Sequence, residues 1–413
     1  MELFKKFNLI TGWIVFAISS LVYILTVEPT ASWWDCGEYI ATAYKLQVGH
    51  PPGAPLFQMI GRFFSLFAFG DVSKVALMVN LMSALSSSFT ILFLYWTITH
   101  LAKKIADQAG EMTNGKMYAI LGSGVVGALA YTFSDSFWFS AVEGEVYAMS
   151  SLFTAIVFWA ILKWENEADG KHATRWILLI AFLIGLSIGV HLLNLLAIPA
   201  IAFVYYFKKF KPTLKGIIYT FIISILLLGI IMNGIIPWIV KLSSLFELTF
   251  VNSFGLPFNT GTAFYFIVLI GLIVWGLHYT IKKQKVLANT LILMFTFILI
   301  GYSSFFMIII RSSSNPPIDE NSPEDAISLL SYLAREQYGD WPILQGQYYN
   351  APTVDLKDGN PVYVKDIKKG KYVITDDKKG LSLFTTPGLQ HCSHVCGATR
   401  NHPTFKCINN MGK

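Results

Sequence analysis

Long apolar runs alternate with short polar segments along the first 310 residues of the chain. A membrane-spanning helix needs about 20 mostly apolar residues, and seven runs come close to that length or exceed it. The pattern predicts an all-α polytopic membrane protein, built as a bundle of transmembrane helices. The predicted spans are 8–27, 75–99, 117–134, 146–163, 215–240, 263–281 and 286–310.

One more apolar stretch, 176–206, has 31 residues, too many for one straight span and too few for two. Glycine, proline and polar residues interrupt it. We expect two short or broken helices that meet near His191, and about nine crossings in total. The interrupting residues are Gly185, Gly189, His191, Asn194 and Pro199.

Lysine and arginine gather in the polar segments between the apolar runs. Cytoplasmic loops of membrane proteins carry such an excess, so these clusters should share one side of the membrane. This predicts a cytoplasmic N-terminus and an outer tail after Arg311. The first apolar run is long and has no A-x-A site after it, so we expect an anchor. The clusters are Lys5–Lys6, Lys103–Lys104 with Lys116, Lys163 to Arg175, Lys208 to Lys215, and Lys282 to Lys285.

The composition agrees with a membrane body and a water-exposed tail. Hydrophobic residues make up 54% of the chain and charged residues 14%, whereas about a quarter of a soluble protein is charged. Residues 311–413 hold 23 of the 56 charged residues. The net charge of +6 lies largely in the loop clusters, so no nucleic-acid partner is indicated. Four cysteines, one early and three late, give no disulfide framework.

The first outer loop, 28–74, carries chemistry that is unusual for a connector. Trp33 and Trp34 precede Asp35, and Glu38 follows three residues later. A carboxylate at the membrane surface can take a proton from a hydroxyl as a general base, and indole rings suit the apolar faces of sugars. The alternative is structural: the tryptophans belong to the interfacial aromatic belt, and Asp35 caps a helix.

Proline and glycine divide this loop into two predicted helices. A helix over 35–46 would place Asp35 and Glu38 on one face, as it does all neighbours at i and i+3. The segment GHPPGAP (49–55) must end that helix, because proline removes a backbone donor and restricts the residue before it. Residues 56–69 then resume a pattern suited to a helix in the membrane interface.

Four strings of residues resemble one family of membrane proteins. They are WWDCGEYIATAYKLQVGHPPGAPLF (33–57), SAVEGEVYA (140–148), GVHLLNLLAIPA (189–200) and NPPIDENSPEDA (315–326). The family is bacterial, common in Bacteroidetes, formerly of unknown function, and similar to a vertebrate protein O-mannosyltransferase. The D-x-x-E-Y and G-H-P-P motifs also resemble the first loop of GT-C glycosyltransferases. The resemblance covers about the first 380 residues.

The resemblance implies a GT-C-like enzyme of the bacterial inner membrane with a periplasmic tail. Such enzymes take sugars from polyprenyl phosphate outside the cytoplasm. Carried over to this chain, the catalytic base is Asp35, with Glu38 supporting it or acting in its place. The implied partners are a polyprenyl-phosphate-linked sugar donor, a protein or glycan acceptor, and the lipid bilayer. The resemblance suggests that the sugar is mannose.

Further polar residues are candidate substrate contacts. Glu143 and Glu145 precede a predicted helix, whose N-terminus favours negative charge. Alternatively, one of them binds the donor phosphate through a divalent cation or hydrogen-bonds the sugar. A divalent cation is the only cofactor considered. His50 of G-H-P-P is a further candidate contact.

Polar residues within or at the end of apolar runs are the remaining candidates. Ionisable groups inside a membrane usually mark function or a polar cavity, although His191 and Asn194 can also simply satisfy hydrogen bonds between helices. Arg311 could pair with a lipid phosphate, or its side chain could reach to the interface.

The tail begins with a predicted helix from Ser322 to about Tyr338, since Ser, Pro and two acidic residues form a typical start. The string VYVKDIKKGKYVITDD (362–377) predicts two short strands around a glycine turn. We therefore expect a transmembrane domain over 1–310 and the start of an α/β extracytoplasmic domain over 311–380.

Residues 381–413 have a different, Cys/His-rich character. A zinc site is one hypothesis, but the spacings fit no standard pattern. The alternative is a frameshifted or truncated reading frame, which would leave the enzyme inactive. The zinc candidates are His391, Cys392, His394, Cys396, His402 and Cys407.

The favoured function is therefore a membrane glycosyltransferase. A transporter or lipid-sugar flippase is an alternative, because the broken stretch near 185–199 and its polar residues would suit transport. A non-catalytic scaffold of an envelope complex is another, in which the first loop serves as a docking surface. The scaffold hypothesis predicts that Asp35 and Glu38 are individually dispensable.

Overall fold

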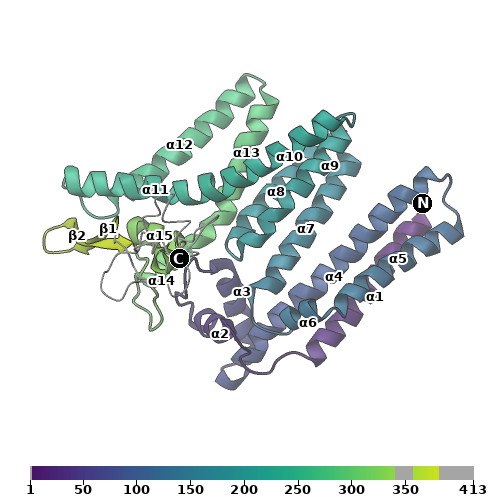
Figure 1. Ribbon diagram of the computed structural model, residues 1–413, viewed down its shortest axis with the longest axis horizontal. Helices are drawn as coiled ribbons and strands as arrows, with labels where there is room; N and C mark the ends of the chain where they lie inside the picture. The colour runs from purple at the N-terminus through teal and green to yellow at the C-terminus, as the bar shows by residue number, and fades with distance from the viewer. Residues whose placement is uncertain (1, 340–356, 381–413) are drawn as a thin grey trace, which may run out of the picture. The chain divides into compact units, whose positions relative to one another are not determined.

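The computed structural model describes residues 2–339 and 357–380 (Figure 1). These residues form fifteen α-helices and two strands, with short 3₁₀ and π segments between them. The helices are α1 Glu2–Leu25, α2 Cys36–Lys45, α3 Pro55–Ser65, α4 Val75–Gln108, α5 Asn114–Thr132, α6 Asp135–Ala141, α7 Val146–Glu167, α8 Ala173–Ile188, α9 Ile198–Lys209, α10 Leu214–Gly229, α11 Ile236–Leu248, α12 Thr260–Lys282, α13 Val286–Tyr302, α14 Phe306–Ser312 and α15 Ala326–Leu333. The strands are β1 Lys357–Asp366 and β2 Lys371–Gly380.

The protein is an all-α polytopic membrane protein, as its apolar runs predict. Within the described residues, seven helical stretches are long and apolar enough to cross a membrane, and the number is eight if α5 and α6, bent by 69° at their junction, are one span. The shorter apolar helix α8 is additional. The seven are Glu2–Leu25, Val72–Gln108, Val146–Glu167, Leu192–Lys209, Leu214–Ser253, Thr260–Lys282 and Val286–Ser312.

The predicted break near His191 is confirmed. Helix α8 ends at Ile188, a 3₁₀ helix covers Leu192–Ala197, and α9 begins at Ile198. Proline is accepted in the first turn of α9, where its missing N–H would have no partner in any case.

Two compact units make up the described chain. The first contains the chain up to Ile239 together with Phe266–Asp325, and the second contains Val240–Tyr265 and the chain from Ala326 onward. The predicted domain division at 310 stays a prediction, since a compact unit need not fold separately.

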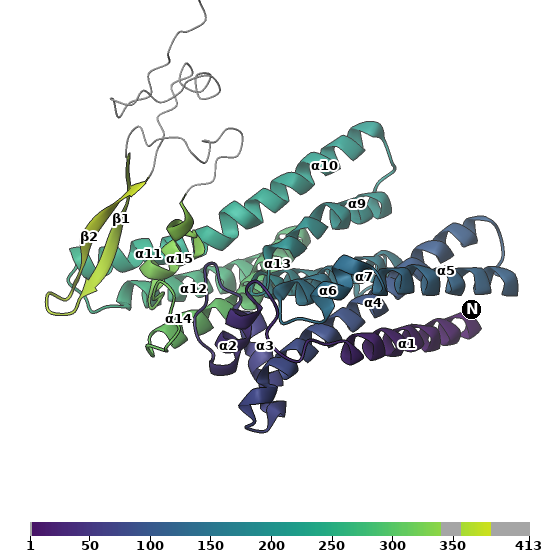
Figure 2. The ribbon, with the colours of Figure 1, turned by 60° about the horizontal axis from the view of Figure 1, so that its bottom comes forward.

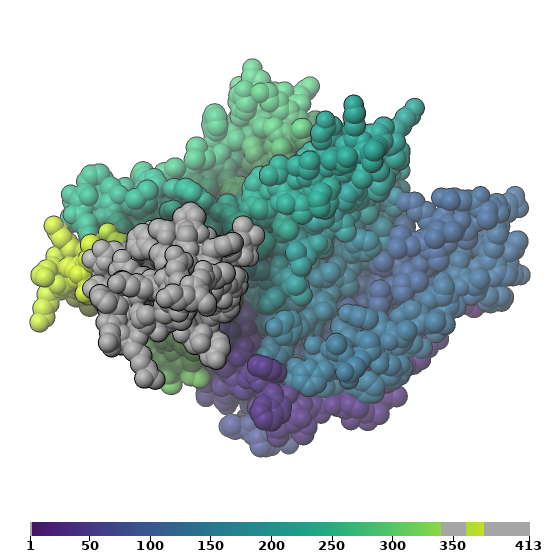
Figure 3. Space-filling view, in the orientation of Figure 1, coloured from purple at the N-terminus to yellow at the C-terminus, as the bar shows by residue number. Residues whose placement is uncertain are grey.

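Helix α4 is the central element of the first unit. It packs against α1, α5 and α7, and its first half also contacts α2 and α3. Figure 1 shows α4 and α5 side by side, and the blue atoms of this part of the chain form the right-hand side of Figure 3. Ser83, Ser86, Ser87 and Ser88 are buried along α4. Small side chains let neighbouring helices approach closely where lipid provides little hydrophobic driving force.

Three of the basic clusters meet at one end of this unit. Lys104 at the end of α4 pairs with Glu165 at the end of α7. Lys209 at the end of α9 donates to the Asp169 carboxylate at 2.9 Å and to the Ala168 carbonyl at 2.9 Å. The first outer loop lies at the opposite end, where α4 begins, and Figure 2 shows α2 and α3 together there.

In the second unit, the predicted hairpin forms with Gly370 in its turn at φ 62°. The strands are antiparallel, and Val364 pairs with Val373. Asn252 fixes this hairpin, because its Nδ2 donates to the Tyr372 carbonyl at 2.9 Å and its Oδ1 accepts from Tyr372 N at 2.8 Å. The predicted strands are therefore confirmed.

The predicted tail helix starts later than its sequence indicates. Helix α15 begins at Ala326, and a 3₁₀ turn follows over Glu336–Tyr338. Asn321 and Ser322 have φ of 58° and 40°, so the chain turns there before the helix can start. The proposed zinc ligands and the rest of 381–413 lie outside the described residues.

Helices α8 and α13 touch through backbone at two glycines, which generates the first prediction. A Cβ at Gly301 would lie 2.8 Å from Gly185 Cα, closer than real Cβ contacts allow. We expect Gly301→Ala to lower the unfolding free energy by about 1–3 kcal/mol through overpacking. Thermal unfolding in detergent would measure this loss.

The matched control is Gly271→Ala, because a Cβ at Gly271 in α12 meets nothing within 4 Å. Its melting temperature should equal or slightly exceed that of the wild type. Equal melting temperatures for the two variants would contradict the packing assigned to Gly301.

Candidate functional site

Asp35 stands at the N-terminus of α2 without capping it. Its φ and ψ are −84° and 0°, and its carboxylate accepts no capping hydrogen bond from the helix. The side chain is 57% exposed. Trp34, just before it, has φ 63°, a left-handed conformation uncommon for a bulky residue. The structural role considered for Asp35 is therefore not what its carboxylate does here.

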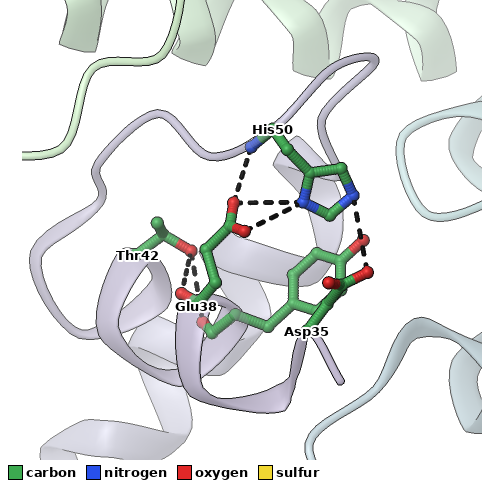
Figure 4. Close-up of polar contacts among 5 residues, drawn as sticks. Asp35, Glu38, Thr42 and His50 are labelled. Carbon is green, nitrogen blue, oxygen red and sulfur yellow. Dashed lines mark hydrogen bonds and ion pairs between the residues drawn. The ribbon is translucent and has the colours of Figure 1, made fainter. Parts of the chain in front are cut away.

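Glu38, one helical turn further along α2, holds His50. The His50 backbone N donates to Glu38 Oε1 at 2.6 Å, and His50 Nδ1 lies 3.1 Å from both carboxylate oxygens (Figure 4). Since the carboxylate can only accept when ionised, Nδ1 carries a proton. Glu38 thus fixes both the main chain and the ring of His50.

The other ring nitrogen of His50 faces Asp35. His50 Nε2 lies 3.8 Å from Asp35 Oδ2 (Figure 4). Asp35, Glu38 and His50 each offer a ligand atom, and these atoms lie within 4.8 Å of one another. The set has the oxygen and nitrogen donors that a divalent ion such as Mn²⁺ or Zn²⁺ accepts, so these three residues could hold a metal.

Electrostatics couples the histidine to its carboxylate. The hydrogen bond that His50 donates to the Glu38 carboxylate is the main cause that raises the pKa of His50, against the effect of burial. Burial alone would raise the pKa of Glu38, but the hydrogen bonds and charge of His50 outweigh it and lower that pKa. The pair is therefore stabilised as imidazolium and carboxylate.

Close packing around this pair explains its neighbours. A Cβ at Gly49 would collide with Glu38 Oε1, so only glycine lets the turn approach this carboxylate. The ring of Tyr39 packs edge-on against His50 at 5.6 Å and against Phe57 at 5.2 Å. The sequence marked Tyr39 only as the last residue of the D-x-x-E-Y motif, and nothing in that motif indicated that its ring packs against His50.

Asn80, which sequence reasoning missed, joins two outer segments at this end. Its fully buried Nδ2 donates to the carbonyls of Glu28 at 2.6 Å and Thr30 at 2.8 Å. Glu28 N in turn donates to the Val142 carbonyl at 3.0 Å. A Cβ at Gly144 would lie 2.8 Å from Asn80 Oδ1. The segment before Asp35 and the second outer loop therefore meet on α4.

The second outer loop brings two buried carboxylates. Glu143 is 4% exposed and Glu145 5%. Glu145 is the N-cap of α7, and its carboxylate accepts a hydrogen bond from Val146 N at 3.2 Å. This contact agrees with the structural interpretation, in which the residue serves the N-terminus of the helix. Burial, together with the charges of Asp35 and Glu143, raises the pKa of Glu145 to about 7. Burial and the charges of both glutamates also raise the pKa of the Cys36 thiol, which stays neutral.

His191 and Asn194 lie in the break between α8 and α9. The half-buried His191 ring tilts against Tyr147 at 5.5 Å, and its Nδ1 accepts from Leu193 N at 3.1 Å. Asn194 is fully buried, and its Nδ2 donates to Ser187 Oγ at 2.7 Å. His191 thus borders Tyr147, two residues after Glu145, whereas Asn194 serves the packing of the break.

The remaining candidates lie at the two ends of α2. Trp33 and Trp34 are 81% and 87% exposed. With Glu28, Ala31 and Ser32 they line a shallow, open hollow of about 390 Å³, and Asp35 is the next residue in the chain. Arg311 contacts the other end of α2, where its Nε donates to the Leu46 carbonyl at 2.6 Å.

Comparison with known proteins adds a family likeness. Residues 35–214 match the N-terminal domain family of protein O-mannosyl-transferase TMEM260. The Dictyostelium discoideum protein of that name is 28% identical over 159 residues, which are 38% of this chain and 17% of that protein. The Mus musculus protein is 29% identical over 175 residues, 42% of this chain and 22% of that protein.

The chain is thus similar to a vertebrate protein O-mannosyl-transferase, and the match spans about a fifth of the length of these relatives. No solved structure matches it. The matched segment begins at Asp35 and includes Glu38, His50, Glu143, Glu145, His191 and Asn194.

Glu145 should make stability depend on pH. Because its folded pKa is about 7 against an ordinary 4.5, the folded chain keeps a proton that the unfolded chain has lost. Wild-type stability therefore falls as pH rises from about 4.5 to about 7 and is level above that. Glu145→Gln removes this loss, so the variant should be more stable at pH 8 by on the order of 1–3 kcal/mol.

Thermal unfolding in detergent between pH 5 and 8.5 would measure the difference. Glu111→Gln, which changes an exposed loop carboxylate, is the control and should follow the wild type. Parallel curves for Glu145→Gln and the wild type would contradict the raised pKa.

Proposed function

We propose that this chain is a GT-C-type glycosyltransferase of the membrane. It moves a sugar, mannose by similarity, from a polyprenyl-phosphate donor to a hydroxyl of a protein or glycan outside the cytoplasm. The observation that carries the proposal is the exposed Asp35 carboxylate, held at the start of α2 beside the fixed Glu38–His50 pair. The names of both relatives, protein O-mannosyl-transferase, support transfer of a sugar.

In the proposed reaction, Asp35 accepts the proton of the acceptor hydroxyl. The hydroxyl oxygen bonds to the anomeric carbon of the sugar while the bond from that carbon to the phosphate oxygen breaks. Polyprenyl phosphate leaves with the bonding electron pair. A carboxylate suits the base because it is ionised at neutral pH and within solvent reach. No step requires a metal, although Asp35, Glu38 and His50 could hold one.

Aromatic and polar neighbours would bind the substrates. Trp33 and Trp34 line the open hollow and would cover the apolar face of a sugar. His191, next to Tyr147, is the proposed contact for the donor phosphate. One of the buried carboxyl groups of Glu143 and Glu145 is the proposed hydrogen-bond partner of the sugar.

The basic clusters support the proposed orientation. Lys104, Lys208 and Lys209 lie at the end of the first unit opposite the first loop. If that end is cytoplasmic, the N-terminus is inside and Asp35 is outside. The proposed location is the bacterial inner membrane, with the tail in the periplasm.

Asp35→Asn should abolish transfer while leaving the fold intact. Loss of a general base costs about 10²- to 10⁴-fold in rate, and Asn keeps the size of the side chain. The measurement is transfer of labelled mannose from polyprenyl-phosphate-mannose to endogenous protein in membranes, at matched expression.

Asp71→Asn is the matched control, because Asp71 is an exposed carboxylate of the same loop whose contacts are local: it caps a 3₁₀ turn and pairs with Lys74 at 3.2 Å. It should transfer at the wild-type rate. Full transfer by Asp35→Asn would rule out Asp35 as the base. Movement of the sugar-lipid across the membrane without transfer would favour the flippase. Binding of an envelope partner that survives substitution of Asp35 or of Glu38 would favour the scaffold.

A further inference from the structure

The turn between α2 and His50 decides how the site is assembled. Only Leu46, Gln47, Val48 and Gly49 separate the end of α2 from His50. Leu46 is left-handed with φ 48°, and Val48 is fully buried. Because Glu38 sits on the helix and His50 follows the turn, their contact exists only if this turn keeps its shape.

A segment some 265 residues away in sequence is hydrogen-bonded to this turn. Arg311 Nε donates to the Leu46 carbonyl at 2.6 Å, and Arg311 Nη2 donates to the Lys45 carbonyl at 3.3 Å. Val48 N donates to the Ile318 carbonyl at 3.0 Å, and Glu320 N donates to the Val48 carbonyl at 3.1 Å. We call residues 311–320 the strap.

The strap has an internal bond that shapes it. Ser312 Oγ donates to Asp319 Oδ2 at 3.1 Å, which joins the end of α14 to the residues that pair with Val48. The strap therefore reaches the turn at two places, through a side chain at its start and through backbone at its end.

Arginine suits the first of these places. The last carbonyls of a helix have no partner within the helix and carry partial negative charge. A guanidinium donates from several nitrogens in fixed geometry, so one side chain can serve two carbonyls, whereas lysine presents a single point charge. Arg62 of α3 does similar work one residue earlier, where its NH1 donates to the Tyr44 carbonyl at 2.8 Å, but it does not reach the turn.

We propose that Arg311 is a positioning residue: through the strap it fixes the turn 46–49 and so holds His50 between Glu38 and Asp35. Its guanidinium then serves the protein's own carbonyls, in place of the donor phosphate considered from sequence. For catalysis this inference rests on the proposed function, but the positioning itself can be measured without any transfer reaction.

The readout is the exchange of the backbone amides in the turn and at His50. The His50 backbone N donates to Glu38 Oε1 at 2.6 Å, and Val48 N donates to the Ile318 carbonyl at 3.0 Å. Release of the turn would separate His50 from Glu38 and open both hydrogen bonds. These amides would then exchange faster with solvent.

The experiment is backbone hydrogen–deuterium exchange of the full-length protein in detergent, followed by mass spectrometry of peptides that cover residues 46–50. Arg311→Met should raise the exchange rate of this turn on the order of tenfold or more, and Arg311→Lys should raise it by less. Arg175→Met, which changes an exposed residue, is the control substitution and should leave the exchange of this turn at the wild-type rate.

Transfer kinetics provide the second readout. With His50 misplaced, kcat should fall on the order of tenfold to a hundredfold, while KM for the lipid donor stays within about twofold, because a positioning residue does not bind the donor. A raised KM with unchanged exchange of residues 46–50 would overturn the proposal in favour of phosphate binding by Arg311. Unchanged exchange and unchanged kinetics would overturn it outright.

The two proposals fail in distinguishable ways. If the wild type transfers no sugar, the proposed function fails, yet the exchange of residues 46–50 still tests Arg311. If Arg311→Met does not fold, Arg311→Lys retains a donor to one carbonyl and still reports a partial increase in exchange. A Lys variant with the wild-type exchange rate would contradict the positioning role.

Discussion

The hydrogen-bonded pair of Glu38 and His50 is the contact on which the rest of the site depends. It joins two segments that proline and glycine would otherwise leave independent, because G-H-P-P-G-A-P cannot continue a helix. Two bonds to the ring and one to the backbone fix both the position and the orientation of the imidazole. Without these hydrogen bonds, the ring could rotate and Nε2 would not be held facing Asp35.

Several neighbours are explained by what this pair requires. Gly49 leaves room for the carboxylate, and the edge of Tyr39 supports the imidazole ring. Asn80 of α4 holds the segment that leads to Asp35 by hydrogen bonds to the carbonyls of Glu28 and Thr30, which fixes the backbone before Asp35. A site built on short, clamped helices is held more tightly than one carried on a free loop. The first outer loop is thus a framework with few degrees of freedom.

Local sequence signals predicted the fold well and the site only in part. Run length and interrupting residues predicted the spans and the break near His191, and Gly370 predicted the hairpin turn, because these features depend on neighbouring residues. The spacing of Asp35 and Glu38 placed them on one face of α2. The contacts of His50, Asn80 and Arg311 bridge 12 to 265 residues, and such contacts leave no periodic pattern in a single sequence.

Charge balance favours Asp35 over Glu38 as the proposed base. The imidazolium of His50 touches Glu38 at 3.1 Å but stands 3.8 Å from Asp35, beyond hydrogen-bond distance. The charge of Glu38 is therefore balanced by His50, and both of its carboxylate oxygens already accept hydrogen bonds from His50. The Asp35 carboxylate has no such partner at hydrogen-bond distance from the ring, and its side chain is 57% exposed. In the proposed reaction an acceptor hydroxyl can therefore reach Asp35 while Glu38 and His50 stay paired with each other.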